Sequence, residues 1–329
     1  MVGNRCNCKN QGLGIIGSPG DLCSKYIYVA NEGSNSIAVI DSDTNQIVKE
    51  ICLGFMPYAL AVNPIVNAVY VVNKNNNSVT VIDSTINEII ENITVGYIPV
   101  SVAVDPSTNI VYVVNYGSNT LSLINGYTNN VISVLNTGFG PYGITINPAT
   151  NRVYVSNTVE STITVIDGYN KTVLTKFKAT PTPGKIAVDC VNNFLYVISR
   201  DNSNIDVIDC NTNNRLYPHI YSLDPRDVAV NQNTGKVYIT RIEFFNYAYS
   251  SIVQAIDGNK VWDIEHNSRY IEVGCDAYGI SVDSMKNLIY VTNPSANNIV
   301  VLDGDTEQVI GSIEGLNRPR AIAQCILGS

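Results

Sequence analysis

Charged residues are scarce in this sequence, and basic residues are scarcer than acidic ones. Only 15% of the 329 residues are charged, and 20 Lys and Arg stand against 28 Asp and Glu, which gives a net charge of -8. Nucleic acids and anionic membrane surfaces bind proteins through clustered Lys and Arg. We therefore expect neither of them as a partner of this chain.

Long apolar runs, zinc-type cysteine pairs and histidine clusters are also missing. No stretch approaches the ~20 apolar residues of a membrane helix, so no membrane insertion is expected. The first ten residues, MVGNRCNCKN, lack the apolar segment of a secretory signal, so no signal peptide is visible. The eight cysteines include no C-x-x-C motif, and the two histidines, His219 and His266, stand apart from each other. These absences predict no metal site and no cofactor.

The sequence does contain an internal repeat of 42 residues, the kind of period that indicates a repeat architecture. A tyrosine followed by an apolar run and a polar stop recurs with this spacing five times, and once with a spacing of 52. The tyrosines are Tyr28, Tyr70, Tyr112, Tyr154, Tyr196, Tyr238 and Tyr290. A proline stands thirteen residues before most of them, at Pro57, Pro99, Pro141, Pro183 and Pro225, and Pro319 keeps that phase.

Each repeat carries four strand signals separated by turn residues. In the second repeat they fall at residues 59–63, 68–72, 78–82 and 88–95, and β-branched residues dominate all four. Strands about ten residues apart, without a helical pattern, indicate an all-β protein. Seven units of four strands predict a seven-bladed β-propeller with the first strand of each blade beside the central channel.

The two ends of the repeat array complete one another. Residues 320–325 match only a first strand, and the N-terminal repeat supplies only the second, third and fourth, so one blade is shared between the termini. We therefore expect an N-terminal arm at 1–25 and a propeller domain at 26–329, with an insertion in the sixth unit. Cys23 and Cys325 align at one tight turn, with Cα atoms roughly 5–7 Å apart, so we expect an intrachain disulfide that closes the ring. Two free buried thiols are the alternative.

The Tyr-Val-x-Asn signature, the Asn/Asp-Pro turn and the Val-Ile-Asp strand end resemble the YVTN family of β-propeller repeats over residues 26–325. That family is found largely among bacterial and archaeal surface-layer, periplasmic and other exported proteins. The resemblance implies a binding or scaffolding role without a shared catalytic motif. Ser199 and Arg241 replace the signature Asn, and this departure concerns local turn geometry.

One end of the propeller gathers the side chains best suited to binding. The residue after each proline position begins an inner strand at the channel mouth, and five of these residues are Tyr or Arg. They are Tyr58, Tyr142, Arg226, Tyr278 and Arg320. Phenol rings and forked guanidinium donors suit an anionic or sugar-like ligand. The alternative is that these side chains pack between blades and close the channel.

The insertion in the sixth unit adds aromatic residues to a loop expected on that same face. They are Phe244, Phe245, Tyr247 and Tyr249. So many aromatic side chains either fold over the face or contact a partner. Trp262 belongs to a second, shorter part of the insertion and is expected to pack locally.

Two further sets of residues are of types that often have functional roles, but their positions in the repeat indicate structural roles. An Asp ends the third strand of most repeats, at Asp41, Asp83, Asp167, Asp209, Asp257 and Asp303, where it is expected to cap a turn. A lyase-type propeller enzyme needs a His beside the central face, whereas His219 and His266 fall in outer-strand regions. We therefore expect no catalytic residue.

The N-terminal arm contains Cys6 and Cys8 and lies outside the repeat. An arm that adds as a strand to a neighbouring molecule builds multimers or fibres, which these two cysteines can cross-link. The alternative is an arm folded back on its own ring. The leading hypothesis is a non-enzymatic scaffold protein at a cell or spore surface, or outside the cell, whose partner is itself or another surface protein. A monomeric binding module is the alternative, and an enzyme has the least support.

Overall fold

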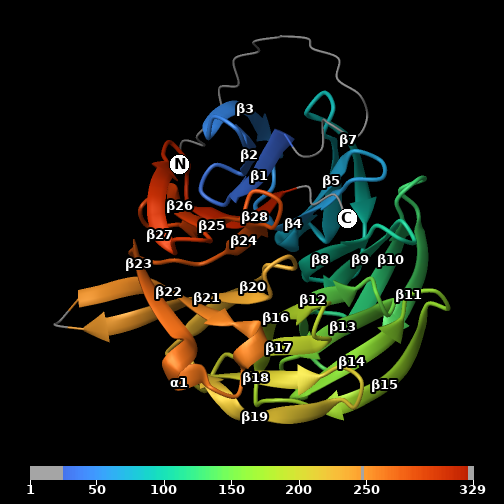
Figure 1. The fold of residues 1–329 in the computed structure, drawn as a ribbon. Helices are drawn as coiled ribbons and strands as arrows, with labels where there is room; N and C mark the ends of the chain where they lie inside the picture. Colours follow the sequence, from blue (N-terminus) through green and yellow to red (C-terminus); the bar gives the residue numbers. More distant parts are fainter. Residues whose placement is uncertain (1–24, 246–247, 325–329) are drawn as a thin grey trace.

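Seven four-stranded antiparallel sheets form a closed ring in the computed structural model of this chain (Figure 1). The structure describes residues 25–245 and 248–324. The predicted all-β, seven-bladed propeller is confirmed, and helix is almost absent from the described residues. The 3-10 helices Lys74–Asn76 and Gly258–Lys260 and the one-turn helix α1 (Ile264–Asn267) lie in connections.

We name the blades A to G in order around the ring, and give their strands from the channel outward. Blade A has β28 (Pro319–Gln324), β1 (Tyr26–Asn31), β2 (Ser36–Asp41) and β3 (Gln46–Cys52). Blade B has β4 (Pro57–Asn63), β5 (Ala68–Asn73), β6 (Ser78–Asp83) and β7 (Glu88–Thr94). Blade C has β8 (Pro99–Asp105), β9 (Ile110–Asn115), β10 (Thr120–Asn125) and β11 (Val131–Asn136).

The remaining four blades follow the same order. Blade D has β12 (Pro141–Asn147), β13 (Arg152–Asn157), β14 (Thr162–Asp167) and β15 (Thr172–Lys178). Blade E has β16 (Pro183–Asp189), β17 (Phe194–Ser199), β18 (Asn204–Asp209) and β19 (Asn214–Tyr221). Blade F has β20 (Pro225–Val230), β21 (Lys236–Phe245), β22 (Ala248–Asp257) and β23 (Ser268–Gly274). Blade G has β24 (Ile280–Asp283), β25 (Leu288–Asn293), β26 (Asn298–Asp303) and β27 (Gln308–Ile313).

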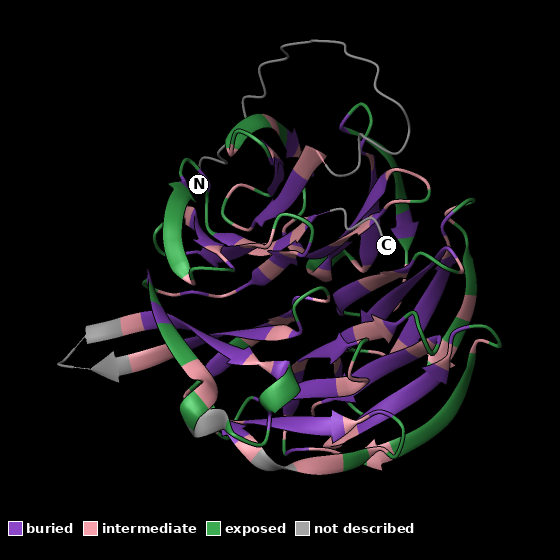
Figure 2. Ribbon diagram, viewed as in Figure 1, coloured by how far each residue is buried: buried purple, intermediate pink, exposed green. Residues whose placement is uncertain are grey.

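Burial explains the pattern of apolar residues within each repeat. The second and third strands are covered on both faces by neighbouring blades, so β5 and β6 read as nearly continuous apolar runs and are buried throughout their middle. The fourth strands form the rim and are largely exposed, as Figure 2 shows for β11 and β15. The core is therefore a ring of interfaces between blades, each closed by a buried repeat tyrosine such as Tyr70 or Tyr112.

The repeated polar residues close turns, as expected. Asp41 accepts hydrogen bonds from the backbone N–H groups of Asp43 and Thr44, and the same pattern recurs at the other third-strand ends. The signature Asn donates to hydroxyl groups of the adjacent third strand, as Asn157 does to Thr162 and Thr164.

Blade A is assembled from both ends of the chain, which confirms the predicted closure. Strand β28 pairs with β1, so the red and blue ends of the ribbon lie side by side in Figure 1. The predicted Cys23–Cys325 bond and the predicted roles of Cys6 and Cys8 lie outside the described residues. Cys52 at the end of β3 is disulfide-bonded, a role that was not predicted from the sequence.

The insertion in the sixth unit forms a hairpin and not the predicted loop. Strands β21 and β22 pair without a break from Lys236↔Asp257 to Phe245↔Ala248, and the hairpin projects from the ring in Figure 1. The inserted residues extend two strands that were already antiparallel, so the existing ladder simply continues. Trp262 is 66% exposed, so the predicted local packing of its side chain was wrong.

Candidate functional site at the channel mouth

A β-bulge places one or more unpaired residues at the start of most first strands. In blade B the register passes from Pro57↔Asn73 to Ala59↔Val72, so Tyr58 is left without a partner. Blades A, C, D, E and F show the same shift after their prolines. A bulge redirects a side chain out of the regular pleat, and proline tolerates the first position of a strand because it has no N–H to pair. The repeat therefore supplies a ring of side chains at one end of the channel.

Four of the predicted site residues meet around one cavity of about 80 Å³ in this channel. They are Tyr58, Tyr142, Tyr278 and Arg320. Its apolar walls come from the first strands and include Leu60, Val102, Ile280 and Ile322. The cavity has room for several ordered waters or for the head group of a small ligand.

The Arg320 guanidinium is held between two phenol rings. Its centre lies 4.3 Å from the ring centroid of Tyr58 and 4.5 Å from that of Tyr278. One nitrogen donates to the Tyr278 hydroxyl at 2.7 Å, and another lies 3.3 Å from a Glu32 carboxylate oxygen. Gly279 permits this approach of blades G and A, because a Cβ there would lie 2.5 Å from the Arg320 carbonyl oxygen. The guanidinium is thus fixed before any ligand arrives.

Two of the three phenols form a polar pair across the channel. The hydroxyl oxygens of Tyr58 and Tyr142 lie 3.3 Å apart. Burial acts to raise the pKa of Tyr58, but the Arg320 charge and the Tyr142 hydrogen bond outweigh it and hold that pKa below its ordinary value. Burial and the neighbouring phenols raise the pKa of Tyr142. Either hydroxyl can be the donor of this pair.

Two charged residues of the cavity, Lys185 and Asp227, were not predicted from the sequence. Each stands two positions after a proline, whereas we considered only the first position. Lys185 falls within the bulge of blade E, and its ammonium group forms no hydrogen bond or ion pair within the described part of the chain. Burial raises the pKa of the Asp227 carboxyl, while the charge of Lys185 opposes that rise. In blade F the bulge is Arg226 alone and Asp227 is the first paired residue after it, so only a search of both positions after each proline would have identified the two residues.

Two predicted parts of the site lie elsewhere. Arg226 is exposed and forms an ion pair at 2.6 Å with Asp224, so it does not line the cavity. The Asp224 carboxylate, two residues earlier in the chain, binds the Arg226 guanidinium instead. Phe244, Phe245 and Tyr249 belong to the projecting hairpin, and their side chains, like the whole of Tyr247, lie outside what the structure describes.

The histidines occupy outer positions remote from this cavity. His219 in β19 lies 2.9 Å from a carboxylate oxygen of the buried Asp206, which also pairs with Arg215. His266 in α1 is exposed beside Asp263 at 2.8 Å. Among residues 25–245 and 248–324 no three His, Cys, Asp or Glu side chains are grouped to hold a metal ion. Within the same residues, no helix is long and apolar enough to cross a membrane.

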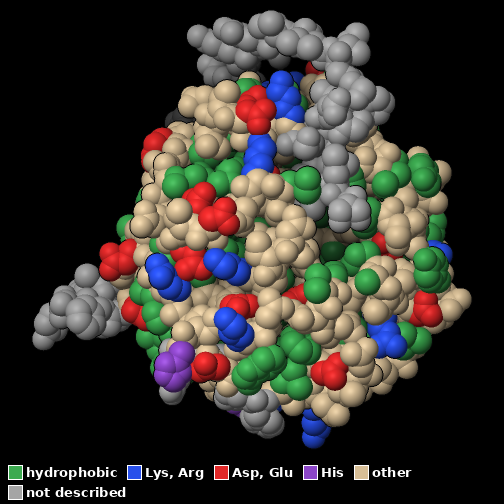
Figure 3. All heavy atoms as spheres, in the orientation of Figure 1, with side chains coloured by type: hydrophobic (Ala, Val, Ile, Leu, Met, Phe, Trp, Pro, Cys, Tyr) green, Lys and Arg blue, Asp and Glu red, His purple; other side chains and the backbone are tan. Residues whose placement is uncertain are grey.

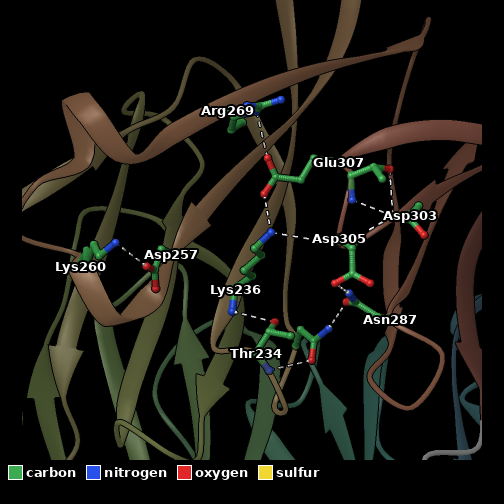
Figure 4. A network of polar contacts seen from close by, with 12 residues as sticks. Thr234, Lys236, Asp257, Lys260, Arg269, Asn287, Asp303, Asp305 and Glu307 are labelled. Carbon is green, nitrogen blue, oxygen red and sulfur yellow. Dashed lines mark hydrogen bonds and ion pairs between the residues drawn. The ribbon is translucent and has the colours of Figure 1, made fainter.

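The densest charge network joins blades F and G and has a structural role. Lys236 donates to Glu307 at 2.6 Å and to the Gly304 carbonyl at 3.0 Å, and Arg269 lies 3.0 Å from the other Glu307 oxygen (Figure 4). Charged side chains gather over this part of the ring, around β22 to β27, in Figure 3. Every cation of this network faces a carboxylate, so it offers no open position for a ligand.

The comparisons with known proteins identify a fold and no family. No family model matches this chain, and no curated protein matches it. A functionally unknown protein from Desulfotomaculum acetoxidans superposes with a TM-score of 0.76 at 15% identity, over 92% of this chain and 99% of that one. Hydrazine synthase from Kuenenia stuttgartiensis gives 0.71 at 18% identity, over 81% and 89%. A protein from Lactobacillus plantarum gives 0.67 at 13% identity, over 91% and 98%. At these identities the likeness shows a β-propeller fold alone.

Proposed function

We propose that this chain is a binding propeller that holds a small organic anion at its channel mouth and does not transform it. The observation that supports this proposal is the presence of two cations, Lys185 and Arg320, in the wall of one cavity. Glu32 and Tyr278 already engage Arg320, whereas the Lys185 ammonium has no hydrogen-bonding partner among the described residues. Lys185 is half-buried, and its ammonium group would gain charge-assisted hydrogen bonds from a bound anion.

The surrounding groups favour a carboxylate on a ring-shaped body. A carboxylate accepts charge-assisted hydrogen bonds from Lys185, and the phenol rings that line the cavity offer apolar surface to a sugar ring. The Tyr58 hydroxyl and the Asp227 carboxyl offer further hydrogen-bonding positions for ligand hydroxyl groups. A sugar acid combines all of these features.

Calorimetric titration with sodium D-glucuronate tests this proposal, with acetate and D-glucose as the separate carboxylate and sugar. We expect glucuronate to bind more tightly than acetate, and glucose not to bind measurably.

Lys185→Met should weaken glucuronate binding at least about 10-fold, because a charged hydrogen bond contributes about 1.5–3 kcal/mol. Lys178→Met, which removes an equal charge from the exposed strand β15, is the matched control and should change nothing. The proposal is contradicted if neither glucuronate nor acetate binds, or if Lys185→Met binds glucuronate as tightly as the unchanged protein does.

A second function, self-assembly into a scaffold at a cell or spore surface, is favoured by the composition of the rim. The outer strands expose aliphatic side chains, including Val48, Ile90, Val134, Leu174 and Ile310. Apolar side chains exposed along a rim offer contact surface to further chains. Under this second proposal the arm at 1–25 links one propeller to the next, with Cys6 and Cys8 as cross-links, and the partner is a further copy of this chain.

Electron microscopy of the protein with and without reductant tests the second proposal. Multimers or fibres are expected from the full chain and should be lost from a variant that lacks residues 1–20. Single propellers in every sample contradict assembly through the arm and leave the binding proposal unaffected.

A further inference from the structure

One sector of the ring carries no charge at all. From residue 106 to residue 151 there is no Asp, Glu, Lys, Arg or His, although 15% of the whole chain is charged. This stretch forms β9, β10 and β11 of blade C and the inner strand β12 of blade D. Asp105 just before it is fully buried. The neutral surface therefore belongs mainly to blade C, in a molecule whose net charge is -8.

The rim of this sector is an open strand edge. Strand β11 pairs with β10 on one side only, because it is the last strand of its sheet. Its sequence is Val-Ile-Ser-Val-Leu-Asn, and Val131, Ile132 and Val134 are exposed. A short segment of high β propensity without charge or proline, placed at a sheet edge, has the properties that promote pairing with another strand.

The other outer strands are protected from such pairing. Five of them carry charges or proline, as natural edge strands usually do. These residues are Lys49 and Glu50 in β3, Glu88 and Glu91 in β7, Lys176 and Lys178 in β15, Arg215 and Pro218 in β19, and Arg269 and Glu272 in β23. Strand β27 has neither, but Gly311 interrupts it and Glu307 and Glu314 flank it. A β-bulge does not distinguish β11 from the other outer strands. The pairing of β3, β7, β15 and β27 with the third strand of their blades contains the same register shift as the pairing of β11 with β10.

We propose that β11 pairs antiparallel with β11 of a second copy of this chain, so that two blades C join into one eight-stranded sheet. The inference develops the self-assembly function proposed above but does not involve the N-terminal arm. A second copy is the occupant that the charge pattern favours. Two molecules that each carry a net charge of -8 approach most easily where neither presents charge, and blade C is that place.

The pairing also fixes the symmetry of the pair. Antiparallel pairing of identical strands generates a two-fold axis perpendicular to the sheet, which gives an isologous and self-limiting contact. Such an axis turns one propeller over relative to the other. The two channel mouths then open in opposite directions, and both binding cavities stay accessible.

Sedimentation of the variant that lacks residues 1–20, in reductant, tests the inference without the arm or its cysteines. We expect a reversible dimer, and we expect Val134→Lys to weaken it about 100-fold or more, because the substitution would bury two like charges in the interface between the two strands. The matched control is Ile90→Lys in β7, at an outer-strand position that is 54% exposed against 57% for Val134. This control should leave the dimer intact.

Hydrogen exchange supplies the second readout. The backbone amides of residues 131–136 should exchange more slowly at concentrations that favour the dimer, and those of residues 88–94 should not change. Circular dichroism verifies that both lysine variants remain folded. A variant lacking residues 1–20 that stays monomeric at every concentration overturns the inference, as does an equal effect of the two lysine substitutions. Loss of fibres on deletion of the arm, with this dimer retained, separates the two modes of assembly.

Discussion

At the scale of single residues, the connections between blades depend on backbone conformations that only some side chains tolerate. The residue before the proline of a first strand has a positive φ in several blades, at 51° for Ile98, 46° for Thr182 and 65° for Gly140. A β-branched residue is strained in this region, whereas glycine is not. The Ile98 N–H is held by the Asn77 side chain at 2.9 Å, so the surrounding structure imposes the conformation.

Replacement of Ile98 by glycine should therefore stabilise the protein. The left-handed conformation costs a non-glycine residue roughly 1–2 kcal/mol, and glycine recovers most of this in spite of its larger entropy when unfolded. We expect the free energy of unfolding to rise by about 1 kcal/mol, measured by urea denaturation. Tyr97→Gly, one residue earlier and at an ordinary φ, is the control and should lower it. A fall in stability for Ile98→Gly would show that the loop is not strained at this position.

At the scale of the strand, pairs of asparagines link neighbouring blades at the end of the channel opposite the cavity. An Asn at or just after the end of a first strand donates to an Asn in the turn of the next blade, as Asn63 does to Asn109, Asn147 to Asn193 and Asn231 to Asn287, at 2.7 to 2.8 Å. The donors are fully buried. Each bond joins elements 46 or 56 residues apart, so together they hold the inner strands in a ring.

Loss of one such bond should be costly. Asn147→Ala leaves the half-buried Asn193 oxygen without this donor and also removes the acceptor of the Ala149 and Thr150 N–H groups, and we expect a loss of about 1–3 kcal/mol in the free energy of unfolding. Asn170→Ala, which removes a bond within an exposed turn, should change the same quantity by less than about 0.5 kcal/mol. Guanidinium denaturation of both variants measures the difference, and equal effects would argue against the inter-blade bond as a stabilising contact.

The spacing of the tyrosines and prolines sufficed to predict the strand order, the shared blade and four of the residues that line the cavity. The phase of the repeat places Tyr58, Tyr142 and Tyr278 at equivalent positions, and equivalent positions face the same channel. Lys185 escaped prediction because a bulge of two residues changes which side chain faces inward. Arg226 was misplaced because pairing with Asp224 depends on side-chain reach, which periodicity does not encode. The inserted hairpin was read as a loop because its sequence is neither strictly alternating nor bounded by turn residues.

At the scale of the whole molecule, the seven repeat tyrosines form a belt of buried phenols between the blades. Burial raises the pKa of each of them above the ordinary value of 10.0, to about 12 for Tyr70 and Tyr290. The folded state therefore keeps these groups neutral where the unfolded chain would ionise them. Ionisation of these tyrosines at alkaline pH should therefore weaken the interfaces between all the blades together.

Stability should consequently decline with rising pH on the alkaline side. The contribution of the phenols is fully present below pH 10.0, the unfolded value, and is lost as the pH rises through the folded values, near 12 for Tyr70 and Tyr290. Urea midpoints on either side of pH 10, together with the absorbance of ionised tyrosine, test this expectation. The phenols should ionise together with the loss of the β-sheet circular dichroism signal. Ionisation of all seven repeat tyrosines in a protein that keeps its sheet signal would contradict it.

The shared blade also sets an order of events during synthesis. Strands β1, β2 and β3 leave the ribosome first, yet the inner partner of β1 is β28, which is made almost three hundred residues later. Six blades can complete themselves as the chain emerges, but blade A stays three-stranded until Gln324 is available. Until then the apolar edge beside Ile27 and Val29 is open to other nascent chains, so the first blade to be translated is the last to be finished.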